Sequence, residues 1–221
     1  MEFGKVDHPE NIDFTLPEDH PDTKMMLISH KNDQPFEVYV GCAKWNKKDL
    51  KGFYPRGTKD ELIYYSSQFN SIELNATFYK APSISQVQTW RDKVPDGFKF
   101  YPKISRSISH FSRLSNVKDS LTAFCDAIVN FDNTLGIPFL QLHDNFRPKD
   151  LDRLQDFIKE FPKGMPLAVE VRNDEWFLKG KENDQLWDLL REEDKVAILV
   201  DTAGRRDLLH MRLSSPHAFI R

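Results

Sequence analysis

The stretch that decides the fold is residues 137–171, IPFLQLHDNFRPKDLDRLQDFIKEFPKGMPLAVEV. It begins and ends with short apolar runs, Ile137–Leu142 and Leu167–Val171, which are typical of buried strands. Between them, apolar residues recur at steps of three and four after Pro148, which suits a first helical turn. The order strand, helix, strand predicts two parallel strands joined by a crossover helix.

The same alternation extends in both directions along the chain. The further predicted strands are Glu37–Cys42, Ser71–Ala76, Phe98–Ile104, Val196–Asp201 and Ala218–Arg221. Helical patterns occupy Lys59–Asn70, Ser85–Val94, the stripe from Leu121 to Ile128, and the stripe from Leu186 to Leu190 with Asn183 or Asp184 as N-cap. Such alternation predicts an α/β fold with parallel strands.

Two α/β architectures compete, an open doubly wound sheet and a (β/α) barrel. No glycine-rich phosphate fingerprint follows the first strand, where the sequence reads Gly41-Cys42-Ala43-Lys44-Trp45. Polar residues at the strand ends also favour a TIM-like barrel. Only seven strands are predicted, and an eighth would need roughly 30 further residues, so we expect a barrel truncated after its seventh strand.

The first 36 residues differ from the rest. Pro9, Pro17 and Pro21 stand among acidic and histidine residues without a helical or strand period, which predicts an irregular N-terminal arm. We therefore expect an arm over residues 1–36 and a barrel domain over residues 37–221.

Composition limits the partners and the compartment. The formal net charge is −3 at pH 7, which gives no broad attraction to nucleic acid or to anionic membranes, although a local basic cleft stays compatible with it. Cys42 and Cys125 match no metal or redox spacing, so we expect two buried free thiols. Because the sequence shows no signal peptide and no apolar run of ~20 residues, we expect a soluble cytoplasmic protein. Nothing in the sequence specifies the oligomeric state.

Polar residues stand at the end of six predicted strands. Residues two apart on a strand share a face, and the carboxyl ends of parallel strands are where binding groups collect in α/β folds. The residues concerned are Glu73 with Asn75, Tyr101 with Lys103, Gln141 with His143, Glu170 with Arg172, Asp201, and Arg221.

These residue types predict a polar pocket with acid–base groups and anion-binding groups. Glu73 and Glu170 are the expected acid–base pair, and Lys103, Arg172 and Arg221 would neutralise an anionic ligand. The alternative is a structural charge network that pairs Glu73 with Lys103 and Glu170 with the arginines.

Further residues complete the predicted site. His110 and Asp201 are additional acid–base candidates, while Asn75 and Gln141 would orient the ligand. Trp45 and Tyr79 follow the first and second predicted strands, where their rings are expected to wall the pocket, to stack on a planar ligand or to cover the rim.

No nucleotide cofactor is predicted, because the sequence contains no phosphate loop and no dinucleotide fingerprint. Glu73, His143, Glu170 and Asp201 are residue types that bind divalent metals. No short metal-binding motif is present, however, and the nearby cations would compete for the same carboxylates. A bound divalent metal is therefore compatible with the predicted site but is not favoured. The sequence does not identify any cofactor.

Several blocks of the sequence together resemble one known family. Gly41–Trp45, Gly52–Pro55, Phe69–Tyr79, Pro95–Phe100 and Ala168–Arg172 resemble, in order, blocks of the YecE-like family, catalogued as domain of unknown function seventy-two. Shorter matches occur at Lys103, His110, Leu135–Gly136, Phe139–Leu142, Glu175–Phe177 and Asp201. The resemblance spans residues 37–221 and implies a TIM-like barrel, but it implies no established reaction.

The resemblance also implies that certain polar positions recur in the family. They are Glu73, Asn75, Thr77, Tyr79, Lys103, His110, Gln141, Glu170, Arg172 and Asp201. Two departures stand out. Many relatives have Gln-Leu-Pro-Pro where this sequence has Gln141-Leu-His143-Asp144, and relatives continue beyond the position of Arg221 to an eighth strand.

The leading functional prediction is an acid–base enzyme, a hydrolase or an isomerase, that acts on a small polar, anionic or sugar-like molecule at the carboxyl ends of the strands. A protein that binds such a molecule without turnover is the second hypothesis. A nucleic-acid-processing barrel is the third, and the acidic charge balance argues against it.

Overall fold

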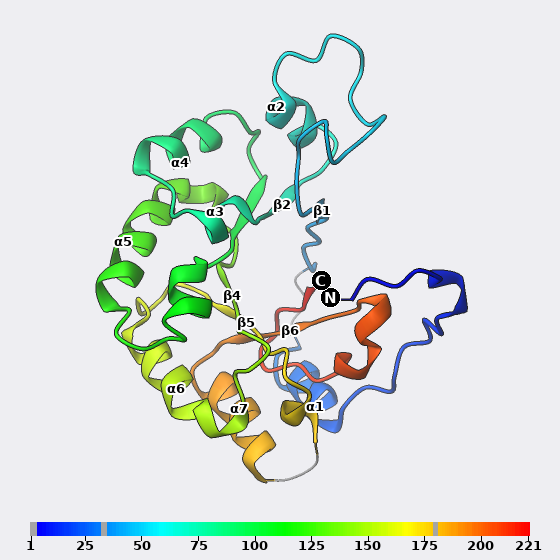
Figure 1. Cartoon of the computed structure of the whole chain (residues 1–221), viewed down its shortest axis with the longest axis vertical. Helices are drawn as coiled ribbons and strands as arrows, with labels where there is room; N and C mark the ends of the chain where they lie inside the picture. The colour runs from blue at the N-terminus through cyan, green and yellow to red at the C-terminus, as the bar shows by residue number, and fades with distance from the viewer. Residues whose placement is uncertain (1–3, 32–34, 179–180) are drawn as a thin grey trace. The chain divides into compact units, whose positions relative to one another are not determined.

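The computed structural model describes residues 4–31, 35–178 and 181–221. Within these ranges the chain is an α/β protein in which parallel strands alternate with helices (Figure 1). The strands are β1 (Gly41–Cys42), β2 (Ser71–Leu74), β3 (Lys99–Pro102), β4 (Phe139–Gln141), β5 (Ala168–Glu170), β6 (Val196–Leu199) and β7 (Phe219–Ile220). The α-helices are α1 (Pro21–Ser29), α2 (Glu61–Ser66), α3 (Ala76–Tyr79), α4 (Ile84–Arg91), α5 (Lys118–Ile128), α6 (Leu151–Glu160) and α7 (Lys181–Glu192).

The predicted strands are confirmed in number and order, although each is shorter than its apolar run. The described strands form a sheet in the order β1-β2-β3 and a sheet in the order β4-β5-β6-β7. The chain divides into two compact units. One comprises residues 35–139 and 161–165, and the other comprises residues 1–34, 140–160 and 166–221.

In the unit of residues 35–139, β2 pairs with both β1 and β3 in parallel. β1 approaches β2 so closely that a Cβ on Gly41 would lie 2.0 Å from the carbonyl oxygen of Ser71, so only glycine fits there. α4 and α5 pack side by side (Figure 1). The core is aromatic, since Phe100 stacks on Phe131 and packs edge-on against Phe98.

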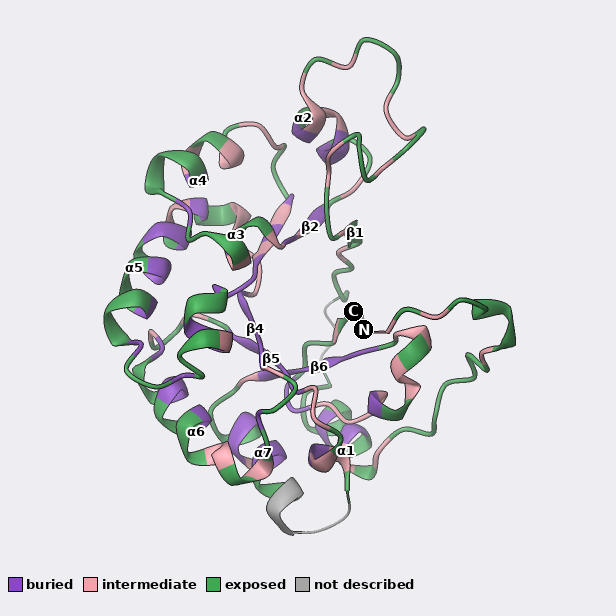
Figure 2. Ribbon diagram, viewed as in Figure 1, coloured by how far each residue is buried: buried purple, intermediate pink, exposed green. Residues whose placement is uncertain are grey.

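In the other unit, β6 pairs in parallel with β5 and β7, and α7 lies against β6. β5 and β6 are buried along their whole length (Figure 2), as predicted for strands in apolar runs, and the buried residues of β5 include Glu170. The apolar stripe of α6 also faces the core, since Leu154 and Ile158 are buried.

Two expectations about the helices are wrong. The N-terminal arm is not irregular throughout, because Pro21–Ser29 form α1. The helix is stabilised at its start by His20, whose Nδ1 accepts a hydrogen bond from the backbone N–H of Asp22, and by the hydroxyl of Thr23, which donates to the carbonyl oxygen of Met211. This long-range contact leaves no periodic signal in the sequence. The second error concerns α7, which begins at Lys181, so the predicted N-cap lies inside the helix.

None of the helices in the described residues has the combination of length and apolar composition that crossing a bilayer requires.

Candidate functional site

Glu170 at the end of β5 is the centre of a buried polar cluster. Its side chain is fully buried, and both carboxylate oxygens accept hydrogen bonds from the side-chain amide of Gln141, at 2.9 and 3.0 Å. Nε of Arg172 donates to Oε1 at 2.8 Å, and Nη1 of Arg221 donates to Oε2. The structure thus brings together four predicted site residues from the ends of β4, β5 and β7.

The charge state of Glu170 follows from these contacts. Burial alone would raise its pKa, but the guanidinium groups of Arg221 and Arg172 and the amide of Gln141 outweigh it and hold the pKa below its ordinary value. Glu170 is therefore ionised at neutral pH. The structure therefore contains the ion pairs of Glu170 with Arg172 and Arg221 that the sequence offered as an alternative.

The two arginines remain accessible beside the buried carboxylate. The side chains of Arg172 and Arg221 are 16% and 18% exposed. Nη1 of Arg172 also lies 3.8 Å from a carboxylate oxygen of Asp144, and the carbonyl oxygen of Arg172 accepts a hydrogen bond from Arg205. Asp144 and Arg205 are not among the predicted site residues, because their contacts with Arg172 join positions that are distant in the sequence.

A second polar group lies at the ends of β2 and β3, in the unit of residues 35–139. β2 ends at Leu74, and Asn75 has helical backbone angles, so the prediction that Asn75 continues the strand is wrong. Its side chain nevertheless meets that of Glu73, because Nδ2 of Asn75 donates to Oε1 of Glu73 at 2.7 Å.

Lys103 follows β3 and is buried, with its ammonium nitrogen 4.3 Å from the centre of the Phe78 ring and 5.8 Å from that of Phe139. The hydroxyl of Thr77 lies 2.7 Å from the carbonyl oxygen of Lys103 and 2.8 Å from that of Leu74. Thr77 therefore links the ends of β2 and β3. A cation over an aromatic face is an attractive arrangement.

His110 lies in a single π-helical turn, Ser107–Phe111, rather than in an ordinary loop. Its Nδ1 is 2.9 Å from the hydroxyl of the buried Ser109, and its ring packs edge-on against Phe78 at a centroid distance of 5.0 Å. Phe78 therefore contacts both Lys103 and His110. Sequence reasoning missed Ser109, although its position four residues after Ser105 is the spacing of a hydroxyl-to-carbonyl bond within a helical turn.

The structure places the remaining predicted site residues elsewhere. Trp45 packs edge-on against Trp90 at 5.9 Å and lines a depression of about 300 Å³ with the start of α2. Tyr79 is 66% exposed, with the guanidinium carbon of Arg106 5.6 Å from its ring centre. Asp201 forms an ion pair with Arg206.

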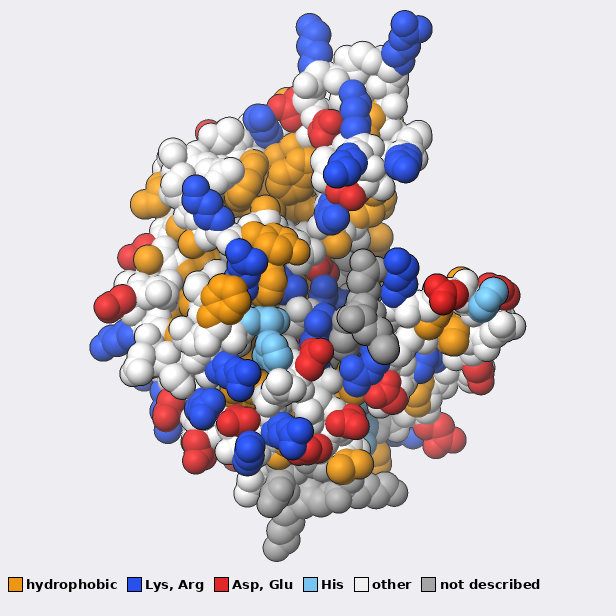
Figure 3. Space-filling model, in the orientation of Figure 1, with side chains coloured by type: hydrophobic (Ala, Val, Ile, Leu, Met, Phe, Trp, Pro, Cys, Tyr) orange, Lys and Arg blue, Asp and Glu red, His pale blue; other side chains and the backbone are white. Residues whose placement is uncertain are grey.

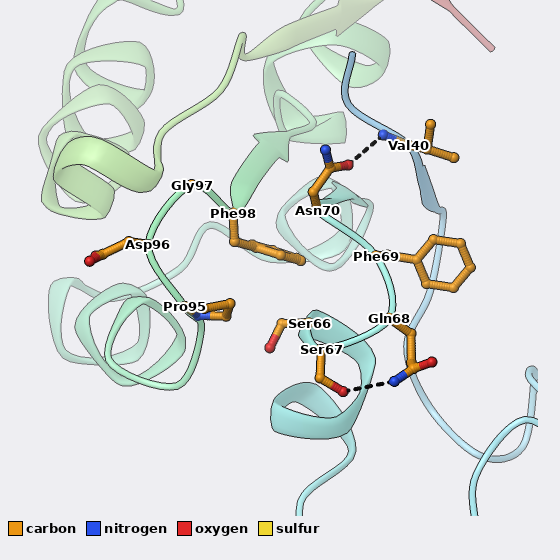
Figure 4. A pocket seen from close by; sticks show the side chains of 10 residues that line it. All are labelled: Val40, Ser66, Ser67, Gln68, Phe69, Asn70, Pro95, Asp96, Gly97 and Phe98. Atoms are coloured by element: carbon orange, nitrogen blue, oxygen red, sulfur yellow. Dashed lines mark hydrogen bonds between the residues drawn. The ribbon is translucent and has the colours of Figure 1, made fainter. Parts of the chain in front are cut away.

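A larger depression of about 640 Å³ lies at the opposite ends of β1, β2 and β3 (Figure 4). Val40, Asn70 and Phe98, which precede the three strands, are among the residues that line it. Glu73, Asn75 and Lys103 stand at the carboxyl ends of β2 and β3, so this hollow does not coincide with the predicted site.

Basic side chains gather over the loop between β1 and α2, while elsewhere on the visible face both signs of charge are interspersed (Figure 3). The exposed cations of this loop are Lys44, Lys47, Lys48, Lys51, Arg56 and Lys59.

Within the described ranges, no three His, Cys, Asp or Glu side chains come together as a group that could bind a metal ion.

Comparison with known proteins places the chain in a family. Residues 39–221 match the family described as "Protein of unknown function DUF72". The chain therefore belongs to the DUF72 family, and the resemblance seen in the sequence is confirmed.

Relatives of known sequence carry no assigned activity in their names. The chain is 29% identical over 168 residues to UPF0759 protein YecE of Escherichia coli K12, covering 75% of this chain and 59% of that protein. It is 25% identical over 150 residues to UPF0759 protein YunF of Bacillus subtilis, covering 63% and 52%. The chain thus spans little more than half the length of these relatives.

Crystal structures of two DUF72 family proteins share the fold. The protein from Thermotoga maritima superposes with a TM-score of 0.68 at 25% identity, covering 84% of this chain and 74% of that one. A structure of the protein from Enterococcus faecalis gives a TM-score of 0.70 at 21% identity, covering 84% and 70%.

Proposed function

We propose that the chain belongs to a TIM-like (β/α) barrel enzyme whose ligand is a small anionic molecule bound by Arg172 and Arg221. The observation that carries the proposal is the full burial of Glu170 between these two arginines at the ends of β5 and β7. The parallel pairing of strands that alternate with helices supports the barrel.

The buried carboxylate favours anion binding because it restrains both guanidinium groups. An arginine side chain that is free to move loses rotamer entropy when it binds a ligand, whereas one already held by a hydrogen-bonded carboxylate loses less. The planar guanidinium also matches the geometry of a carboxylate or phosphate group. Both side chains stay partly exposed at the carboxyl ends of their strands, where ligands bind in parallel α/β folds.

Glu170 is suited to positioning the two arginines rather than to the acid–base role expected from the sequence. A general acid must carry a proton at the working pH, and an effective base must have a pKa near it. The lowered pKa of Glu170 and its hydrogen bonds to three side chains fit neither requirement. We therefore assign Glu170 to positioning the arginines, while acid–base roles for Glu73, His110 and Asp201 stay predictions.

Calorimetric titration with inorganic phosphate and with citrate tests the proposal. We expect saturable binding that weakens by about tenfold or more in Arg172→Lys and in Arg221→Lys, because lysine keeps the charge but loses the planar fork. Arg153→Lys is the matched control, since Arg153 is an exposed arginine whose ion pair with Asp150 lies on α6 and the turn before it. Equal affinity in the variants and the control, or no saturable binding of either anion, would refute the proposal.

A further inference from the structure

The turn that follows β3 holds a buried serine next to a histidine. Ser109 is fully buried, and His110 is only partly accessible. The hydroxyl oxygen of Ser109 has two close polar neighbours, the carbonyl oxygen of Ser105 at 3.0 Å and Nδ1 of His110 at 2.9 Å.

The proton of the Ser109 hydroxyl can serve only one of these neighbours. A carbonyl oxygen has no proton, so its contact with Ser109 is attractive only when the hydroxyl donates to it. The lone pairs of the hydroxyl then face Nδ1 of His110, and this second contact is attractive only when Nδ1 carries a proton. Both contacts are satisfied by one arrangement, a relay from Nδ1–H of His110 to Ser109 and from Ser109 to the carbonyl of Ser105.

We infer that Ser109 is a positioning residue that fixes neutral His110 with its proton on Nδ1, which leaves Nε2 as the basic nitrogen. The hydrogen bond made by one ring nitrogen determines the state of the other. Free imidazole side chains prefer the opposite tautomer, with the proton on Nε2, so the turn selects the form that is less populated in water.

The aromatic neighbour fixes the plane of the ring as well. His110 packs edge-on against Phe78, and the ammonium group of Lys103 lies over the same Phe78 ring. An unprotonated imidazole nitrogen of fixed orientation is the form of the ring that accepts a proton from a ligand. This use of Nε2 rests on the acid–base part of the proposed function, whereas the position of the proton is a property of the chain itself.

Long-range proton–nitrogen correlation spectra of the imidazole rings measure the tautomer directly, without a substrate. His110→Gln identifies the resonances of His110, and a pH titration of the same resonances identifies the range in which the ring is neutral. We expect the wild-type spectrum in that range to show a protonated Nδ1 and an unprotonated Nε2. A wild-type ring with its proton on Nε2 would overturn the inference.

Variants test the part assigned to Ser109. In Ser109→Ala we expect the proton to move from Nδ1 to Nε2, and in Ser109→Cys, which keeps most of the volume but offers a weak acceptor, we expect a shift in the same direction. Ser112→Ala is the control, because Ser112 is an exposed serine at the end of the same turn, and it should leave the wild-type tautomer in place. An unchanged tautomer in the folded Ser109 variants would show that Ser109 does not fix the ring.

The anion titrations and these spectra fail independently. Loss of anion binding would refute the proposed role of Arg172 and Arg221 and leave the tautomer of His110 unaffected. A wrong tautomer would refute the inference about Ser109 and leave anion binding unaffected.

Discussion

The side-chain amide of Gln141 contacts both carboxylate oxygens of Glu170, at 2.9 and 3.0 Å. The two residues lie 29 positions apart in the sequence, near the ends of the neighbouring strands β4 and β5. Because Arg172 and Arg221 contact the same carboxylate, the negative charge of Glu170 is stabilised from three directions.

Glu170→Gln should destabilise the fold strongly, since it removes the charge that compensates two guanidinium groups. Breaking a buried ion pair on one side typically costs about 3 kcal/mol or more. Urea unfolding measures the loss. Asp144→Asn is the matched control, because Asp144 is exposed and lies 3.8 Å from Arg172, and it should cost about 1 kcal/mol or less. Similar losses in both variants would contradict the central role of Glu170.

His210 should make stability depend on pH between about 4 and 6.5. Burial lowers its pKa to about 4, although the hydrogen bond with the carbonyl oxygen of Ile198 opposes the shift. In this window the unfolded chain binds more protons than the folded chain, so stability is full above pH 6.5 and falls as the pH falls toward 4.

The measurement is the free energy of unfolding in urea at several pH values. We expect His210→Gln to lower the slope of stability against pH in this window by up to ~1.4 kcal/mol per pH unit. His8→Gln is the control, because His8 is exposed, and its slope should match that of the wild type. A slope unchanged by His210→Gln would show that His210 does not stay neutral in the fold.

The two cysteines should differ in reactivity toward an aromatic disulfide reagent. Burial raises the pKa of Cys125 to about 12, so very little thiolate is present at pH 8, whereas Cys42 is partly accessible. We expect at most one thiol per chain to react in the native protein, none in Cys42→Ser, and two in denatured wild type. Rapid modification of Cys125 in folded Cys42→Ser would disprove this expectation.

Thr77→Val should loosen the junction of β2 and β3. Its buried hydroxyl lies within hydrogen-bond distance of the carbonyl oxygens of Leu74 and Lys103, and valine leaves both without this donor. We expect a loss of about 1–3 kcal/mol in urea unfolding. Thr89→Val, at an exposed threonine of α4 that donates to Ser85, should change stability by about 0.5 kcal/mol or less. Equal effects at the two sites would contradict the proposed junction.

The order of strands and helices could be predicted because each carries a local signal. β5 and β6 lie in short apolar runs, and the apolar residues of α6 recur at steps of three and four. α1 could not be predicted, because Asp22 and Thr23 are held by Arg212 and Met211, about 190 positions away. Such contacts exist only in the folded chain.

The site shows the same division between local and long-range causes. The contact of Glu170 with Arg172 agrees with their spacing of two residues, whereas Asn75 meets Glu73 although its backbone has left the strand. The sequence could not show which carboxylate is fully buried, because the burial of Glu170 depends on packing and on Arg221, 51 positions away. The place of Glu170 at a strand end predicts an acid–base role, whereas its contacts with Gln141, Arg172 and Arg221 favour a role in positioning the arginines.

Asn70, which lies before β2, substitutes for a peptide group beside the start of β1. Its Oδ1 accepts a hydrogen bond from the backbone N–H of Val40 at 2.7 Å (Figure 4), and its Nδ2 donates to the carbonyl oxygen of Val38 at 2.8 Å. One side chain therefore fixes the alignment of the two strands. A slip of β1 by one residue would break both hydrogen bonds and turn the side chains of β1 to the opposite face of the sheet. Asn70 therefore fixes the register in which β1 pairs with β2.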